Sequence, residues 1–201
     1  MRQSPLLLLL CACTLAHPAL AQSPAPTPAT PVNLFPEGSF ETLTPEGNPV
    51  SWEIPHPSYQ KQLGASFRVQ VEPNGNRFVT LENVDSAKAL HIAAIVPLPE
   101  GATRVRVRFK IRARGLFASP QPEWSSAQLG GNWIDASGAD LGYLRGTQQR
   151  IKTDVPDWME FEEVLTPPAG AARIRLQPGL YQTTGALDLD DIKVFAEVGA
   201  K

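Results

Sequence analysis

Six cationic side chains stand at every second position of one segment, residues 103–114, whose sequence is TRVRVRFKIRAR. The cations are Arg104, Arg106, Arg108, Lys110, Arg112 and Arg114. Because successive side chains of a β-strand point to opposite faces, this alternation predicts a strand with all six charges on one face and apolar residues on the other. Such a face has two uses. It binds a polyanion, or it pairs with acidic residues on neighbouring strands.

Charge pairing is the interpretation that we favour. Residues 158–163, WMEFEE, place Glu160 and Glu162 on one face of another expected strand. Opposite charges on neighbouring strands contribute about 0.2–1 kcal/mol each and discourage aggregation through sheet edges. The whole chain has 18 Lys and Arg against 20 Asp and Glu, a net charge of −2. A mildly acidic chain does not favour nucleic acid as a partner, so the alternative use of the basic face is binding an anionic glycan.

Residues suited to catalysis are sparse. The three histidines, His17, His56 and His91, do not have the spacing of metal ligands. The sequence contains no G-x-S-x-G elbow, no H-E-x-x-H motif and no phosphate-binding loop. Two carboxylates that converge in space, as in a glycosidase, are the enzymatic alternative. We expect that the protein is not an enzyme.

The first 21 residues have the features of a signal peptide. A positive residue, Arg2, precedes a short apolar stretch that ends in the small-x-small sequence ALA. Both cysteines, Cys11 and Cys13, lie inside this segment, so a chain that begins at Gln22 has no thiol. An acylated Cys13 fits less well because the apolar stretch before it is too short. The sequence therefore predicts a secreted or periplasmic protein with no membrane span after removal of the signal.

The rest of the chain is organised as a linker and one all-β domain. Residues 22–32 are rich in Pro, Ala and Thr and predict an extended linker. Short alternating segments with turn residues between them predict strands at 66–71, 77–81, 89–95, 104–114, 126–133, 158–165, 172–176 and 186–195. The Asn74–Gly75 pair predicts a hairpin, and no window has a helical period over three turns. We expect residues 33–199 to form a jelly-roll β-sandwich of antiparallel strands.

Both ends of this domain resemble a known family. The domain opens with NLFPEGSFE at 33–41 and GNPVSW at 47–52, and it closes with GALDLDDIKV at 185–194. These motifs, in this order, resemble carbohydrate-binding modules of the family 4, 9 and 22 type, which have a galactose-binding-like jelly roll. The resemblance covers residues 33 to about 197. It implies a polysaccharide or oligosaccharide partner.

The resemblance also implies a structural calcium ion where the first and last strands meet. Its candidate ligands are the Gly38 carbonyl, the Glu41 carboxylate and Asp190. Calcium takes about six to eight oxygens from carboxylates and carbonyls. The alternative is that Asp190 and Asp191 cap a turn or pair with Lys193 or an arginine. Adjacent acids on a regular strand point to opposite faces, so we expect at most one of the two aspartates as a side-chain ligand.

A sugar site needs aromatic rings for the apolar faces of pyranoses and planar polar groups for their hydroxyls. Trp52 and Trp158 are expected to be packing residues, because the first follows the opening motif and the second begins a strand. The expected ligand surface comprises Trp124, Trp133, Tyr143, Arg145 and Gln148. The alternative is that these rings cover an edge of the sandwich.

The sequence thus predicts an exported domain that binds a carbohydrate without transforming it. The alternative is an exported structural or protein-interaction scaffold with the same fold and a protein partner. The two differ in their exposed aromatic residues, which would line a groove in the first case and form a flat apolar patch in the second.

Overall fold

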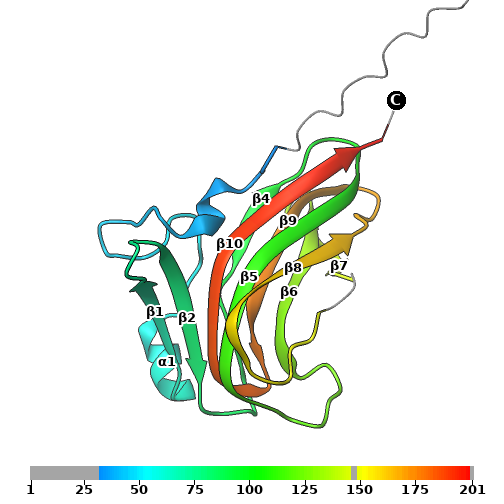
Figure 1. The fold of residues 1–201 in the computed structure, drawn as a ribbon. Helices are drawn as coiled ribbons and strands as arrows, with labels where there is room; N and C mark the ends of the chain where they lie inside the picture. The colour runs from blue at the N-terminus through cyan, green and yellow to red at the C-terminus, as the bar shows by residue number, and fades with distance from the viewer. Residues whose placement is uncertain (1–31, 146–148, 200–201) are drawn as a thin grey trace, which may run out of the picture. The chain divides into compact units, whose positions relative to one another are not determined.

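Two antiparallel sheets stack face to face in the computed structural model, which describes residues 32–145 and 149–199 (Figure 1). The expected signal peptide, the linker up to residue 31, and Gln148 lie outside the described residues. The first sheet has the strand order β1 (Ser66–Val71), β2 (Arg77–Asn83), β10 (Thr183–Val198), β5 (Ala102–Ala118) and β8 (Val155–Leu165). The second sheet has the order β3 (Ala89–His91), β9 (Ala171–Tyr181), β6 (Ser126–Asp135) and β7 (Asp140–Tyr143), and β4 (Ala94–Pro97) also pairs with β9. This arrangement confirms the expected all-β sandwich.

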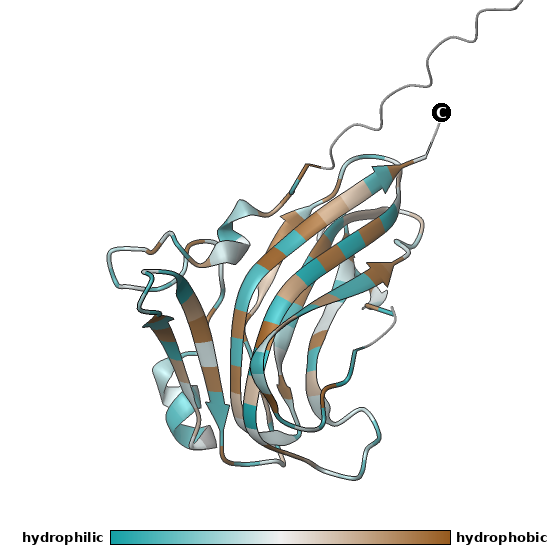
Figure 2. Cartoon of the chain, viewed as in Figure 1, coloured by the Kyte–Doolittle hydropathy of each residue, from teal (hydrophilic) through white to brown (hydrophobic). Residues whose placement is uncertain are grey.

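The core lies between the two sheets and follows from the alternation along the strands. On β5, the residues Val105, Val107, Phe109 and Ile111 are buried, while the residues between them are charged. Figure 2 shows the resulting alternation of hydrophilic and hydrophobic residues along β5. The second sheet supplies the opposing layer, which includes Ile174, Leu176 and Leu180 of β9. The expected packing role of Trp52 is confirmed, since this residue is buried against Phe35 and Phe40.

The expected strand at 89–95 is divided into β3 and β4. Strand β3 pairs with β9 as far as Gly179, and β4 pairs with it from Leu176 onward. Pro178 lies between these two ladders on β9, and a proline has no N–H to donate to a neighbouring strand. The sequence pattern 89–95 is continuous, but its pairing with β9 is interrupted between Gly179 and Leu176.

Three short elements were not expected from the sequence. They are η1 (Pro36–Ser39), α1 (Pro57–Leu63) and β7. Helix α1 begins at a proline, its first turn is capped by the His56 side chain, which accepts a hydrogen bond from the Ser58 amide, and Gly64 ends it in a left-handed conformation. With seven residues, α1 is too short to show a period over three turns. No helix among the described residues is both long and apolar enough to span a membrane.

The six cations of β5 are all paired with carboxylates, which confirms the favoured interpretation of the basic strand. Arg108 contacts Glu162 of β8 at 2.6 Å, as expected from the WMEFEE segment. Most other partners lie on β10. The remaining pairs are Arg104 and Arg106 with Glu197, Lys110 with Asp191, Arg112 with Asp188 and Glu72, and Arg114 with Asp188. Five carboxylates therefore serve the six cations of the basic face.

A β-bulge changes the direction of one acid on β10, Asp191. The register of β10 against β5 shifts between Asp190 and Lys193, and Asp191 has a positive φ of 53°. Asp191 pairs with Lys110 at 2.7 Å, and Asp190 lines a hollow that Lys110 also lines. The expectation that the adjacent aspartates point to opposite faces is therefore wrong, because a bulge interrupts the two-residue period of the strand.

Candidate functional site

A groove of about 470 Å³ runs over the outer face of the second sheet. It is lined by Trp124, Gln128, Leu129, Gly130, Gly131, Tyr143, Leu144, Arg150, Gln177 and Tyr181. These residues come from β6, β7, β9 and the loops that flank them. The groove therefore combines aromatic rings, amides and a guanidinium group on one surface.

Alternation along β6 and β9 places the amides of the groove. Ala127 of β6 and Leu176 of β9 are buried, so the residues next to them point away from the core. Gln128 lies opposite Gly179, and Gln177 lies opposite Gly130. Each glutamine thus faces a position without a side chain on the paired strand; the Tyr181 hydroxyl takes the space over Gly130, and Leu90 and His91 of β3 take the space over Gly179.

Tyr181 forms part of the groove floor. Its hydroxyl donates a hydrogen bond to the Gln177 carbonyl oxygen at 2.6 Å, and its ring stacks on His91 with the two planes 3° apart. A Cβ atom on Gly130 would overlap the Tyr181 hydroxyl, so only glycine fits there. Burial raises the pKa of the Tyr181 phenol far above its usual range, and the group stays a neutral hydroxyl.

Two exposed aromatic rings flank the groove. Trp124 is 43% exposed and lies in the loop between β5 and β6, where its carbonyl accepts a hydrogen bond from the Ser126 hydroxyl. Tyr143 is 81% exposed at the end of β7, where it lies opposite Asn132 of β6. Both residues were expected at the ligand surface from the sequence, and the structure brings them to the same groove.

The other expected site residues lie elsewhere. Trp133 is only 4% exposed and packs in the core between the sheets, so its ring does not reach the groove. Arg145 is exposed but does not line the groove, and Gln148 is outside the described residues. The sequence analysis did not identify four residues that line the groove, which are Gln128, Gln177, Tyr181 and Arg150. The alternation of polar and apolar residues along β6 and β9 carried a signal for the first three.

A smaller hollow of about 180 Å³ lies on the same sheet, on the other side of His91, and Glu53 and Arg175 are among the residues that line it. These two side chains form an ion pair. His91 contacts Gln177 at 3.1 Å and so joins this hollow to the groove. Burial lowers the pKa of the His91 imidazole, Arg175 lowers it further, and Glu53 partly offsets both effects.

The calcium candidates lie where η1 meets β10. A Cβ on Gly38 would overlap the Ile192 carbonyl. Both Glu41 carboxylate oxygens are bound by Arg77, through its amide at 2.8 Å and its guanidinium at 3.2 Å. Asp190 accepts hydrogen bonds from Asn76 and from the Asp191 amide. Glu41 is thus already paired with Arg77, and calcium binding at this corner stays a prediction.

Few other groups of the described acidic residues come close enough together to suggest a metal site. Residues 32–145 and 149–199 contain no cluster of three or more His, Cys, Asp or Glu side chains arranged to hold a metal ion. Asp191 pairs with Lys193 at 3.2 Å as well as with Lys110, which is the salt-bridge alternative raised by the sequence.

Comparisons with known proteins identify the fold. No protein-family model and no curated protein matches the sequence. A solved CBM4 structure has a TM-score of 0.52 at 14% identity, and the match covers 80% of this chain and 98% of that one. The enzymatically active domain of tailspike protein 4 of bacteriophage CBA120 has a TM-score of 0.52 at 12% identity; the match covers 82% of this chain but only 21% of the tailspike. A CBM22-1 xylan-binding domain from Paenibacillus barcinonensis has a TM-score of 0.49 at 13% identity, covering 81% of this chain and 94% of that one. The expected resemblance to carbohydrate-binding modules is thus confirmed for the jelly-roll fold.

Proposed function

We propose that this protein binds a carbohydrate in the groove over β6 and β9 and does not transform it. The observation that carries the proposal is that Trp124 and Tyr143, both exposed, flank a hollow whose floor holds the amides of Gln128 and Gln177. Rings that flank a hollow suit a ligand that enters it, whereas a protein-binding scaffold would favour a flat apolar patch.

The chemistry of the lining matches a polyhydroxylated ligand. The faces of indole and phenol rings pack against the C–H faces of pyranose rings. An amide side chain offers both a donor and an acceptor, so each glutamine is able to pair with the alternating donors and acceptors of sugar hydroxyls. Most polar groups of the groove are uncharged, and we therefore propose a neutral polysaccharide or oligosaccharide as the ligand.

Two further features support binding by an exported protein without catalysis. The described residues that line the groove bring amide, phenol and guanidinium groups to it, whereas hydrolysis of a glycosidic bond needs a pair of carboxylates. The features of residues 1–21 support export to the periplasm or the medium.

Affinity electrophoresis through gels that contain a neutral glucan or xylan tests the proposal. We expect the polysaccharide to retard the protein, and we expect Trp124→Ala and Tyr143→Ala to weaken the retardation by roughly tenfold in affinity, as for the loss of a stacked ring. Phe117→Ala is the matched control, because Phe117 is an exposed ring, 66% accessible, that does not line the groove. Equal loss in all three variants, or no retardation by any neutral polysaccharide, would contradict the proposal and favour the protein-binding scaffold.

A further inference from the structure

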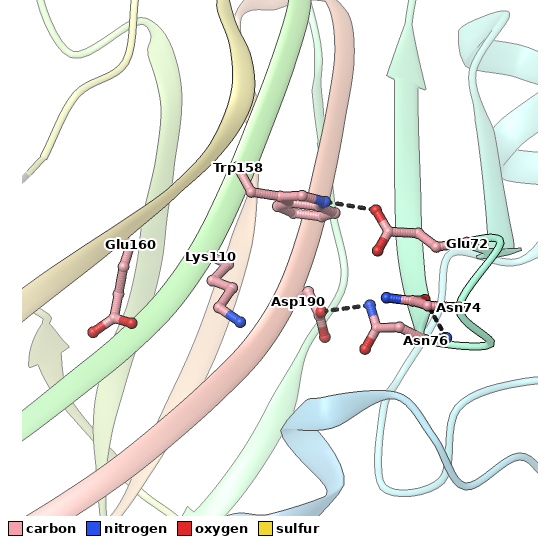
Figure 3. A pocket seen from close by; sticks show the side chains of 7 residues that line it. All are labelled: Glu72, Asn74, Asn76, Lys110, Trp158, Glu160 and Asp190. Carbon is pink, nitrogen blue, oxygen red and sulfur yellow. Dashed lines mark hydrogen bonds between the residues drawn. The ribbon is translucent and has the colours of Figure 1, made fainter.

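A third hollow, of about 300 Å³, lies on the outer face of the first sheet, on strands that do not contribute to the groove. Figure 3 shows its lining, which consists of Glu72, Asn74, Asn76, Lys110, Trp158, Glu160 and Asp190. We call it the Trp158 pocket. Its size is at the lower limit of small-molecule sites, roughly 300–1,000 Å³, so it suits one or two sugar units better than a long chain.

The indole of Trp158 is held in one orientation. Its Nε1 donates to a Glu72 carboxylate oxygen at 2.7 Å across β5 and β10, and its ring makes an edge contact with Phe78 at 5.4 Å between centroids. The Arg112 guanidinium lies over the ring, 4.7 Å from its centroid. Lys110 precedes Arg112 by two residues on the same face of β5, and in Figure 3 it lies with Asp190 on one side of the indole plane. The indole therefore has the Arg112 guanidinium over its ring and lines the pocket on the side where Lys110 and Asp190 lie.

Amides and a carboxylate are held opposite this ring face. The Asn76 side chain donates a hydrogen bond to Asp190 at 3.0 Å (Figure 3). The backbone N–H of Asn76 donates to the side-chain oxygen of Asn74 at 2.9 Å. The hairpin between β1 and β2 holds both asparagines. Asp190 pairs in regular register with Lys110, so alternation along β10 points its side chain toward the pocket, and the bulge with its positive φ follows at Asp191. A non-glycine residue in this conformation is uncommon, and such strain is concentrated at functional sites.

The charges in the pocket do not balance. Lys110 forms its ion pair with Asp191, which does not line the pocket. In the part of the chain that the structure describes, Glu160 and Asp190 form no ion pair, although Asp191 and, less strongly, Asp190 and Glu160 raise the pKa of Lys110. Three carboxylates, those of Glu72, Glu160 and Asp190, line the pocket against one ammonium group, that of Lys110, so negative charge predominates beside the aromatic ring.

We propose that the Trp158 pocket is a second binding site that takes an amino sugar unit with a protonated amine. The C–H face of the sugar ring packs on the indole, the amine pairs with the carboxylate of Glu160, and the asparagine amides bind hydroxyls. A protonated amine next to a ring matches a site that combines excess carboxylates with an aromatic face, and a neutral sugar leaves that excess charge uncompensated. The site does not rest on the function proposed for the groove.

Calorimetric titration of the whole protein with glucosamine, at about pH 6 where the amine is protonated, tests this proposal. A chelator in the buffer keeps metal ions from competing for Asp190. N-acetylglucosamine and glucose are the matched ligands without a charge. We expect glucosamine to bind roughly tenfold or more tightly than either, because a hydrogen bond to a charged group is stronger than one to a neutral group.

The variants separate the site from general stability and from the groove. Glu160→Gln changes an exposed residue, keeps its shape, and should reduce the affinity for glucosamine by roughly tenfold. Trp158→Ala should abolish binding; should it fail to fold, Glu160→Gln and Asn74→Ala, both at exposed residues, still test the site. Trp124→Ala should leave glucosamine affinity unchanged, so that failure of the groove and failure of this pocket are distinguishable. Equal affinity for glucosamine and glucose, or no effect of Glu160→Gln, would overturn the proposal, as would binding of a lysine-rich peptide with no binding of glucosamine.

Discussion

The hydroxyl of Tyr181 occupies the space that a Cβ atom on Gly130 would need. The two residues lie on neighbouring strands, β9 and β6, whose register also places Gly130 opposite Gln177. Because residue 130 has no side chain, the phenol lies across β6 and donates to the Gln177 carbonyl. The absence of a Cβ atom at Gly130 thus allows the Tyr181 ring to form the floor of the groove.

Gly130→Ala should damage both the groove and the fold. A methyl group at this position forces Tyr181 to move, with an expected loss of about 1–3 kcal/mol in the free energy of unfolding, as for other overpacked sites. Polysaccharide retardation should fall with it. Urea unfolding and affinity electrophoresis on the same samples measure the two effects.

A double substitution distinguishes the overlap with the Tyr181 hydroxyl from a change in the stability of strand β6 itself. Tyr181→Phe removes the hydroxyl that the new methyl group meets first, so the double variant Gly130→Ala, Tyr181→Phe should recover part of the lost stability. Energies that simply add would show that the two residues do not interact.

Most of the strand framework was predictable because local patterns specify it. The Asn74–Gly75 hairpin has strand β1 at the expected residues, and the cations of β5 point outward and pair with acids. Both patterns depend on two-residue alternation and turn chemistry, which act over a few residues. The same alternation indicates that Trp133 faces the core, since it lies an even number of residues from Ala127 and Leu129.

The groove and the Trp158 pocket were not predictable in the same way. The groove needs the register of β6 against β9, which brings Gly130 to Gln177 over a separation of 47 residues in the chain. The pocket needs the register that places Lys110 opposite both Asp190 and Glu160, and it needs the hairpin at Asn76 to reach Asp190. Pairing across long separations and local breaks in period depend on the tertiary structure, so no single segment of sequence contains them.

Reversing two cations of the basic strand should leave carbohydrate binding unchanged. Arg106 and Arg108 are paired with Glu197 and Glu162, so Arg106→Glu with Arg108→Glu places like charges next to each other and should lower the melting temperature. Retardation by an acidic polysaccharide should be the same before and after the change. A specific loss of that retardation in folded protein would show that the strand binds an anionic glycan.

The proposed structural calcium predicts a rise in melting temperature when the ion is added to chelated protein, because an ion that binds only the folded state stabilises it. Glu41→Gln should remove this rise, and Glu46→Gln, an exposed residue in a nearby turn, should preserve it. A melting temperature that does not respond to calcium would indicate that the Glu41–Arg77 pair alone closes this corner.

The buried carboxylate of Asp188 should be the most sensitive charged position of the first sheet. It is fully buried, and it accepts hydrogen bonds from Thr80, Arg112 and Arg114 at 2.6–3.2 Å. Asp188→Ala leaves these donors without their partner, and we expect a loss of about 3–5 kcal/mol in the free energy of unfolding. Glu162→Ala, which removes an exposed ion pair, is the comparison and should have little effect. Equal losses in urea unfolding would contradict the special role of the buried acid.

His91 should make the fold less stable in mild acid. Its pKa in the folded protein is lowered by burial, and Arg175 lowers it further against the opposing effect of Glu53, while the stacked Tyr181 and the amide of Gln177 are uncharged. As the pH falls below about 6.5, the unfolded chain takes up a proton that the folded protein resists, so the free energy of unfolding decreases.

The variant His91→Gln isolates this contribution, because it keeps a polar group of similar size and leaves every carboxylate of the protein in place. Urea unfolding of both proteins at about pH 7.5 and pH 5 should show a larger loss of stability in the parent than in the variant. The extra loss of stability in the parent should be fully developed below the pKa of His91 in the folded protein. It should be absent well above pH 6.5, because there the imidazole is neutral in both the folded protein and the unfolded chain. An equal loss in the two proteins would mean that His91 is protonated as readily in the folded protein as in the unfolded chain, and that the imidazole is not shielded by Tyr181 and Arg175 as the structure indicates.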